Sequence, residues 1–399
     1  MAPLSPLGWR RTACGNCRSP NLHSFLDLGA SPLADAFPET DAPELAYPLE
    51  LAVCTDCWLV QLMEVVPGSV LYDGDYGFYT GASPSSILYF SEYAKWALDR
   101  FGDQAHKLTV ELASNDGTLL RHFARAGCPV LGVEPASNVV PSDLPTVVAP
   151  FGRRVAADIF GDRGPAGLII ANNVVAHVED LDDFLGGMHD LLAPDGLAII
   201  EVQYVGDLLT GNQFDHVYHE HRSFFSLGSL ATTLAARGLH VLAYGFTSAQ
   251  GGSLRVVASK RRSTQVAPES EEWLRSLSAY DGFQGRVDRV RDRLLDLLRQ
   301  EERARRTVAG YGASAKSTTL LNYCGIGPDM LDYVADATPA KVGRLTPGTH
   351  IPILGPDDRE PDTYLLLAWN YLAGVLRRER DYMQRGGRFI VPIPVPVVL

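Results

Sequence analysis

The chain has 399 residues, 46% of them hydrophobic, and a formal net charge of −12. This length is enough for two or three domains with full cores. The acidic balance argues against a nucleic acid partner, which requires a basic surface. The sequence has no apolar run long enough for a membrane span and no signal-peptide region at its start, so we expect a cytoplasmic protein without a membrane partner. No coiled-coil or repeat pattern predicts an oligomeric state.

Two Cys-x-x-Cys pairs stand near the start of the chain. The two-residue spacing lets both thiolates of a pair bind one ion, and two pairs complete a tetrahedral shell. A shell filled by cysteine leaves no open position for catalysis. We therefore predict a structural zinc ion in a small head domain, residues 1–69, that has little core of its own. Its ligands are Cys14, Cys17, Cys54 and Cys57.

Residues 70–82 contain three tyrosines and three glycines. Such a composition is typical of a loop that covers a ligand, although aromatic packing at a domain junction explains it equally well. In the first interpretation, Tyr76 and Tyr79 gate a cofactor pocket. A helix is expected next, roughly over residues 83–101.

A buried strand at 108–112, a turn of small residues and a helix near Thr118 together predict a nucleotide-binding unit. Neither a Walker A loop nor Gly-x-Gly-x-x-Gly is present. The next strand ends in Glu134, which is placed to accept hydrogen bonds from both ribose hydroxyls. Together with Glu111 it fits S-adenosylmethionine, which has a ribose and an amino-acid tail but no phosphate. A different ligand on the same strand pair is the alternative.

Strands and helices continue to alternate, which predicts a doubly wound parallel sheet over residues 70–265. Ligands bind at the carboxyl ends of such strands. Two strands over 240–246 and 253–259 fit an antiparallel tail that closes the sheet of a methyltransferase. Three polar residues follow one of the inner strands at this rim: Asn172, Asn173 and His177.

Residues 214–221 hold three histidines, a tyrosine and two acids. No other segment is as dense in groups that move protons near neutral pH. Alternation along an extended segment would put His219 and His221 on one side, as a metal site requires. Because the cysteines account for a metal elsewhere, we favour proton transfer. A metallohydrolase and purely structural histidines are the alternatives.

The remainder, residues 266–399, predicts a small α/β domain reached through a charged, solvated helix. Its first strand runs into Gly310-x-Gly312 and then Lys316 at a helix start. Backbone N–H groups, the helix dipole and a lysine suit a phosphate, whereas tight strand–helix packing is the alternative. The same turn leaves open a nicotinamide cofactor, NADPH.

Taken together, these motifs give the chain a resemblance to the three-domain nucleotide-sugar C-methyltransferases of antibiotic deoxysugar pathways. It resembles most of all those that methylate C3 of dTDP-4-keto-2,6-dideoxysugars (mycarose type). The resemblance covers nearly the whole chain. One departure is Ser317, where many members carry glycine. The motifs that carry it are the four cysteines, VELASNDG (110–117), GVEPA (132–136), NVVAH (173–177), YHEH (218–221), GGSLRV (251–256), GASAK (312–316) and PGTHIP (347–352).

The resemblance implies a zinc head, a central Rossmann-like S-adenosylmethionine domain and a C-terminal Rossmann-like α/β domain that helps hold a dTDP-4-keto-deoxysugar. It implies that His221 is the catalytic base, with Tyr218, Glu220 and His177 beside it. Reduction of the 4-keto group by NADPH, instead of methylation or after it, is the alternative activity. The cofactor residues expected are Tyr79, Glu111, Ala113, Asn115, Gly117, Glu134, Pro135, Asn172 and Asn173. The substrate residues expected are Tyr76, His219, Ser314 and Lys316.

Overall fold

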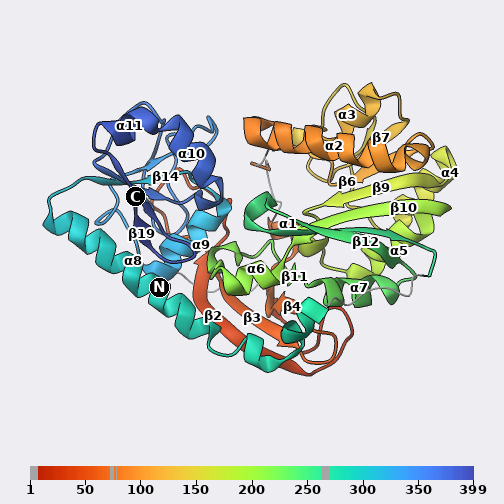
Figure 1. Cartoon of the computed structure of the whole chain (residues 1–399), viewed down its shortest axis with the longest axis horizontal. Coiled ribbons are helices and arrows are strands. Elements are labelled where there is room, and N and C mark those ends of the chain that lie inside the picture. The colour runs from red at the N-terminus through yellow and green to blue at the C-terminus, as the bar shows by residue number, and fades with distance from the viewer. Residues whose placement is uncertain (1–7, 72–75, 78, 263–268) are drawn as a thin grey trace.

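The structure of the chain is a computed structural model that describes residues 8–71, 76–77, 79–262 and 269–399. Three bodies are visible in Figure 1, with the methyltransferase-type sheet on one side, the C-terminal α/β body on the other and the head between them at the bottom. Part of the predicted aromatic loop (72–75 and 78) and the predicted boundary at 265/266 lie outside the described residues.

The head is built from two small antiparallel sheets. The two-stranded sheet pairs β1 (Trp9–Arg10) with β5 (Glu64–Val65). The four-stranded sheet has the order β11-β4-β3-β2. Its strands are β2 (Leu22–Pro32), β3 (Ala46–Cys54), β4 (Val60–Leu62) and β11 (Ser223–Phe224). Strand β11 directly follows residues 214–221, which we call the histidine segment. That segment is therefore joined to the head by backbone hydrogen bonds.

The central body is a seven-stranded sheet of order β12-β13-β10-β9-β6-β7-β8. Six strands run in one direction and β13 is antiparallel to both of its neighbours, which confirms the predicted doubly wound sheet and its antiparallel tail. The chain winds both ways from β6, so its carboxyl end is the point where a ligand is expected. The strands are β6 (Thr109–Leu112), β7 (Val130–Val133), β8 (Thr146–Val147), β9 (Ala166–Asn172), β10 (Leu192–Gln203), β12 (His240–Thr247) and β13 (Ser253–Ser259).

Helices cover both faces of this sheet. In Figure 1, α2 (Pro84–Ala105) and α3 (Leu120–Arg125) lie above it, and α5 (Leu181–Leu191) and α7 (Leu227–Ala235) lie below. The start of α5 is set by Asp180, whose side chain accepts hydrogen bonds from two backbone N–H groups of the first turn. The other helical segments are α1 (Gly68–Leu71), η1 (Thr80–Ala82), η2 (Ser137–Val139), α4 (Arg153–Arg163), η3 (Val175–His177), α6 (Val205–Thr210), η4 (Phe214–His216) and η5 (Ala249–Gly251).

The C-terminal body is a six-stranded sheet of order β16-β15-β14-β17-β18-β19, parallel except for its last strand. Its strands are β14 (Val308–Tyr311), β15 (Val334–Ala335), β16 (Ile353–Leu354), β17 (Thr363–Leu366), β18 (Arg388–Val391) and β19 (Val397–Val398). Its helical segments are α9 (Ala315–Cys324), η8 (Trp369–Tyr371), α10 (Leu372–Arg378) and α11 (Arg380–Gln384).

The segment that leads into this body is η6 (Glu269–Arg275), η7 (Leu277–Ala279) and α8 (Phe283–Arg303). The expectation of a solvated connecting helix holds for one face only. The other face of α8 buries an apolar stripe at helical spacing that includes Val287, Leu294 and Leu298.

One hydrophobic core joins the three bodies. It contains Leu51 of the head, Phe214 and Val217 of the histidine segment, Leu294 of α8 and Leu320 of α9. The histidine segment therefore lies in a core to which all three bodies contribute. Among the described residues, no helix combines the length and the apolar character that a membrane span requires.

Candidate active site

The four predicted zinc ligands meet in the head. Their sulfur atoms all lie within 4.8 Å of one another. The Sγ atoms of Cys14 and Cys57 are 3.6 Å apart, and those of Cys17 and Cys54 are 3.5 Å apart. A tetrahedral ZnS4 site with its usual bond length places sulfur atoms about 3.8 Å apart. The cysteines therefore fit a structural zinc ion.

The histidine segment does not form a metal site. Within the part of the chain that the structure describes, the four cysteines are the only group of three or more side chains arranged to ligate one ion. His219 and His221 have different partners because the backbone turns between them, with the N–H of His221 donating to the carbonyl of Tyr218 over 2.9 Å. The segment is therefore not extended at these residues, so it lacks the geometry on which the metal-site alternative relied.

The predicted cofactor turn follows β6 and has a left-handed backbone at three of its residues: φ is 55° at Ala113, 50° at Asn115 and 72° at Gly117. The turn closes onto the acid at the end of the next strand. The N–H of Asn115 donates to Oε2 of Glu134 over 2.8 Å, and the N–H of Ala136 donates to Oε1 over 2.9 Å. Both oxygens of Glu134 are thereby fixed at the carboxyl edge of the sheet, with the exposed Pro135 beside them.

Glu111 lies in β6, just before this turn, and only 6% of the residue is exposed. Its Oε2 has no hydrogen-bond partner among the described residues. Burial raises the pKa of both Glu111 and Glu134. A buried carboxylate with an unpartnered oxygen suits a ligand that brings positive charge. S-adenosylmethionine does so through its ammonium and sulfonium groups, so the turn fits this cofactor.

The described part of the aromatic loop lies on the cofactor turn. The N–H of Thr80 donates to Oδ1 of Asn115 over 2.9 Å, and the N–H of Gly81 donates to Oδ2 of Asp116 over 2.7 Å. The backbone of Tyr76 exchanges two hydrogen bonds with the Asn138 side chain, of 3.1 and 3.0 Å. These contacts place Thr80 and Gly81 against the turn and Tyr76 against Asn138.

Tyr79 of this loop is 42% exposed, and its hydroxyl donates to the Asn138 carbonyl over 3.5 Å. The rim residues after β9 are also placed by hydrogen bonds. Oδ1 of Asn172 accepts from the Tyr93 hydroxyl over 3.0 Å, and the N–H of Asn173 donates to the Glu201 carbonyl over 2.8 Å.

The His221 imidazole is half-buried and held from two sides. Its Nδ1 is 2.8 Å from the His216 carbonyl, and its Nε2 is 2.8 Å from the Tyr218 hydroxyl. Because a carbonyl only accepts, Nδ1 carries the proton, and Nε2 accepts from the hydroxyl. Burial first, and then the charge of Lys316, lowers the pKa of His221 to about 4, against the opposing effect of the His216 carbonyl. The ring is therefore neutral at pH 7.

His177 and Glu220 complete the group around His221. The His177 ring centroid lies 4.9 Å from that of His221, and its Nδ1 is 3.9 Å from Oε2 of Glu220. Burial lowers the pKa of His177 well below its usual range, and burial together with the nearby Asp35 raises the pKa of Glu220. The structure thus brings together all four residues expected at the catalytic centre.

His219 is placed elsewhere. Its Nε2 donates to the Tyr47 carbonyl of the head over 3.2 Å, and its ring packs edge-on against the Tyr47 ring with centroids 5.5 Å apart. Only 2% of the residue is exposed. The structure does not bring this expected substrate residue to His221; it uses the ring to fasten the segment to the head.

Ser314 and Lys316 lie at the start of α9. The Ser314 hydroxyl accepts from the N–H of Ser317 over 3.4 Å and caps the helix. Lys316 is 7% exposed and its Nζ donates to Oδ1 of Asn370 over 2.6 Å. Burial lowers the pKa of Lys316 to about 8, against the charge of Asp215, which raises it. The lysine thus points toward the histidine segment with its positive charge retained at pH 7.

A second buried polar group lies under α2, and local sequence patterns did not predict it. Glu201 is fully buried; it accepts from the Tyr89 hydroxyl (2.6 and 2.7 Å) and pairs with Arg255 (2.8 Å). The Arg255 guanidinium lies 4.1 Å from the centroid of the Tyr93 ring. A glutamate at the end of an apolar strand was the only local signal, and its partner lies 54 residues away.

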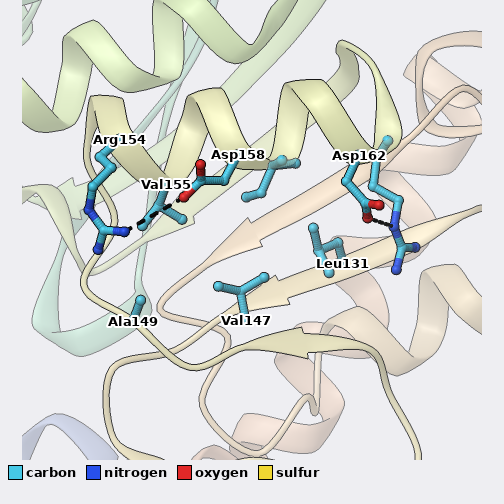
Figure 2. Close-up of a pocket in the computed structure, with 9 residues that line it drawn as sticks. Leu131, Val147, Ala149, Arg154, Val155, Asp158 and Asp162 are labelled. Carbon is cyan, nitrogen blue, oxygen red and sulfur yellow. Dashed lines mark hydrogen bonds and ion pairs between the residues drawn. The ribbon is translucent and has the colours of Figure 1, made fainter.

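The structure contains a groove between two of its bodies and a cavity under α4. A groove of about 610 Å³ runs between the central and C-terminal bodies, with Asp207, Gln213 and Phe246 on one side and Trp369 and Asn370 on the other. A cavity of about 260 Å³ lies under α4 (Figure 2), with an apolar floor and two ion pairs on its rim. None of the residues expected at the active site lines either hollow. The groove adjoins the candidate site through Trp369 and Asn370, which contact Asp215 and Lys316.

The strand order, the cofactor turn and the cysteine cluster define a zinc-binding, S-adenosylmethionine-dependent methyltransferase. Three family models match: a putative zinc binding domain over 14–72, a methyltransferase domain over 89–244 and a C-methyltransferase C-terminal domain over 248–394. C-methyltransferase NovU of Streptomyces niveus is 36% identical over 97% of this chain and 96% of its own. The chain belongs to this family of S-adenosylmethionine-dependent C-methyltransferases.

Two similar solved structures each cover less than half of this chain. Magnesium protoporphyrin IX methyltransferase of Synechocystis PCC 6803 with bound SAM is 14% identical, with a TM-score of 0.33 over 43% of this chain and 78% of that one. The PH0226 protein of Pyrococcus horikoshii OT3 is 12% identical, with a TM-score of 0.38 over 47% of this chain and 96% of that one.

Proposed function

We propose that this enzyme transfers the methyl group of S-adenosylmethionine to C3 of a dTDP-4-keto-2,6-dideoxysugar, through an enolate that His221 generates. The observation that carries the proposal is the half-buried, neutral imidazole of His221, held between the His216 carbonyl and the Tyr218 hydroxyl. Its Nδ1 proton is committed to the His216 carbonyl, so Nε2 is the basic atom. A proton-abstracting base at the carboxyl rim of the methyltransferase sheet is what methylation of a carbon next to a keto group requires.

Carbon is a poor nucleophile until it becomes an enolate. A 4-keto group acidifies the proton on C3. Nε2 of His221 takes that proton, the C3–H electron pair moves into the C3–C4 bond, and negative charge develops on O4. The Tyr218 hydroxyl, which contacts Nε2 in the free protein, turns to O4 and donates to the growing oxyanion.

When bound, S-adenosylmethionine supplies an electrophilic methyl group on sulfur. C3 of the enolate would accept this methyl group, and the 4-keto group would re-form. Glu111, Glu134, Asn115 and the loop that carries Tyr79 would hold the donor over the cofactor turn. Holding two bound reactants in line contributes on the order of several kcal/mol to the rate. Neither step needs a metal, and zinc would act in the head by holding its two cysteine turns together.

The groove between the central and C-terminal bodies supports a sugar nucleotide as the substrate. Its volume of about 610 Å³ lies within the range usual for small-ligand sites. Aromatic and amide side chains line it, and the charge of Lys316 lies behind Trp369, with Nζ 5.4 Å from the ring centroid. Such a lining suits a base, a sugar and an anionic linker. We propose residues 1–69, 70–265 and 266–399 as the three functional units.

The test is to incubate the protein with S-adenosylmethionine and a dTDP-4-keto-dideoxysugar, and to follow product mass and NADPH consumption. The expected product is heavier by one CH2 unit and forms without NADPH. A product that gains only two hydrogens, at the expense of NADPH, would contradict the proposal and support ketoreduction.

A further inference from the structure

The proton position on His221 depends on a carbonyl of the same segment. The His216 carbonyl, 2.8 Å from Nδ1, is the group that fixes this tautomer and the direction of the ring. That carbonyl ends η4, a single 3-10 turn of three residues. A turn this short has little stability of its own and is held by its packing. The position of η4 therefore decides whether His221 presents a bare Nε2.

The C-terminal body holds η4 in place. The indole Nε1–H of Trp369, in η8, donates to Oδ2 of Asp215 over 2.6 Å. The Trp369 ring also packs edge-on against the His216 ring, with centroids 5.8 Å apart. From α9, the Thr319 hydroxyl donates to the Val217 carbonyl over 2.8 Å. Three successive residues of the segment are thus contacted from the C-terminal body.

The hydrogen bond from Trp369 matters because Asp215 is fully buried. Its Oδ1 has no hydrogen-bond partner among the described residues, so the indole N–H is the side-chain donor that the carboxylate has. A buried carboxylate that loses its donor rearranges to find another or takes up a proton. Either response would move η4 and, with it, the His216 carbonyl.

We propose that Trp369 is a positioning residue for the base: by binding Asp215 it fixes η4, and η4 presents the carbonyl that sets the His221 tautomer. The inference rests on the proposed function in that it takes His221 as the base. It gives the C-terminal body a part in proton abstraction beyond holding substrate. A sugar nucleotide bound in the groove, which Trp369 also lines, would stabilise the same arrangement.

The first test is spectroscopic and needs no sugar substrate. Zinc-loaded, full-length protein is labelled with 15N-histidine, and the His221 resonances are assigned by their absence in His221→Asn. The wild type should show a protonated Nδ1 and a bare Nε2. In Trp369→Phe, which keeps an aromatic ring but has no N–H, the resonances should move toward a mixture of tautomers. Unchanged His221 resonances in a folded Trp369→Phe protein would overturn the proposal.

The second test is kinetic. Trp369→Phe should lower kcat about tenfold, the scale of one hydrogen bond to a charged group, while the dissociation constant for S-adenosylmethionine stays within twofold. The matched control is Trp273→Phe in η6, at a tryptophan that is 39% exposed, which should change neither quantity. A loss confined to KM for the sugar nucleotide would mean that Trp369 binds substrate only.

A second pair of variants reaches the same contact from the other side. Asp215→Asn keeps an oxygen that accepts from the indole and should retain the tautomer and most of kcat; Asp215→Ala removes it and should reproduce Trp369→Phe. In the double variant with Asp215→Ala, Trp369→Phe should add no further loss. Additive losses would contradict the proposal. If methyl transfer fails in the wild type while the tautomer still responds to Trp369→Phe, the proposed reaction is wrong and the positioning role stands.

Discussion

The protein contains the same strand–turn–helix pattern twice, and the two copies are used differently. In the central body the N–H of Asn115 donates to Glu134, the acid at the end of the neighbouring strand. In the C-terminal body the N–H of Ala313 donates to Asp336 in the corresponding place, over 2.7 Å. Both turns are therefore closed by the same backbone-to-carboxylate contact.

The difference lies in the polar groups beside each turn. Under the first turn, Glu111 keeps a buried oxygen without a partner among the described residues, which a cationic ligand would satisfy. In the second, Lys316 is bonded to Asn370, and Gly310 packs so tightly that a Cβ there would lie 2.8 Å from a Leu367 carbon. The first turn is arranged to hold a ligand, and the second is arranged to hold a helix against the histidine segment. A glycine-rich turn alone does not distinguish these roles.

The largest expected effect separates holding the cofactor from doing the chemistry. His221→Asn should lower kcat by about 10²- to 10⁴-fold, the usual contribution of a general base, and should stop exchange of the C3 proton with solvent. Binding of S-adenosylmethionine should persist, because the first turn is untouched. Mass spectrometry in D2O and calorimetry measure the two properties. The control is His189→Asn, at a histidine whose side chain is 37% exposed; persistent C3 exchange in His221→Asn would mean that another group is the base.

The next effect compares the two acids directly. Glu134→Gln should weaken binding of S-adenosylmethionine about 10- to 100-fold, because a charged acceptor for the ribose hydroxyls is lost. Asp336→Asn makes the same change at the second turn and should leave that dissociation constant unchanged. Calorimetric titration of both variants gives the comparison. Equal weakening by the two substitutions would show that the turns do not differ as described.

The smallest effect is a shift in pH dependence. Lys316 has a pKa lowered to about 8 by burial, so it is charged at pH 7 and loses its proton as the pH rises through 8. If that charge serves the substrate, kcat/KM of the wild type should fall above pH 8. Lys316→Arg keeps the charge at every accessible pH and should remove this fall. On the acid side His221 must be neutral, and since burial lowers its pKa to about 4, activity should persist below the usual imidazole range near 6.5.

An alkaline fall in kcat/KM that is the same in the wild type and in Lys316→Arg would assign it to another group. The role of α9, which carries Lys316, would then be purely structural.

Much of the fold follows from local patterns in the sequence. The apolar run at 108–112 predicted β6 to within one residue and Glu134 directly follows β7 as expected, and the two Cys-x-x-Cys pairs predicted the cluster that the head forms. The candidate site was harder to predict. The metal-site alternative relied on an extended histidine segment, but a turn from Tyr218 to His221 sends His219 to the head instead.

Contacts between distant segments could not be predicted from the sequence. Trp369 and Asp215 are 154 residues apart, and neither has a neighbour that indicates the other. The pairing of β11 with β4, which joins the histidine segment to the head, is equally remote. Such contacts depend on how whole bodies dock, which local composition does not encode.

The position of the transferred methyl group tests the central claim most directly. Incubation of the enzyme with S-adenosylmethionine that carries a CD3 group and a dTDP-4-keto-2,6-dideoxysugar, followed by NMR of the product, locates the label. We expect the CD3 group on C3, with the 4-keto group intact and the C3 proton lost to solvent. A CD3 group on oxygen, or on any other carbon, would contradict it.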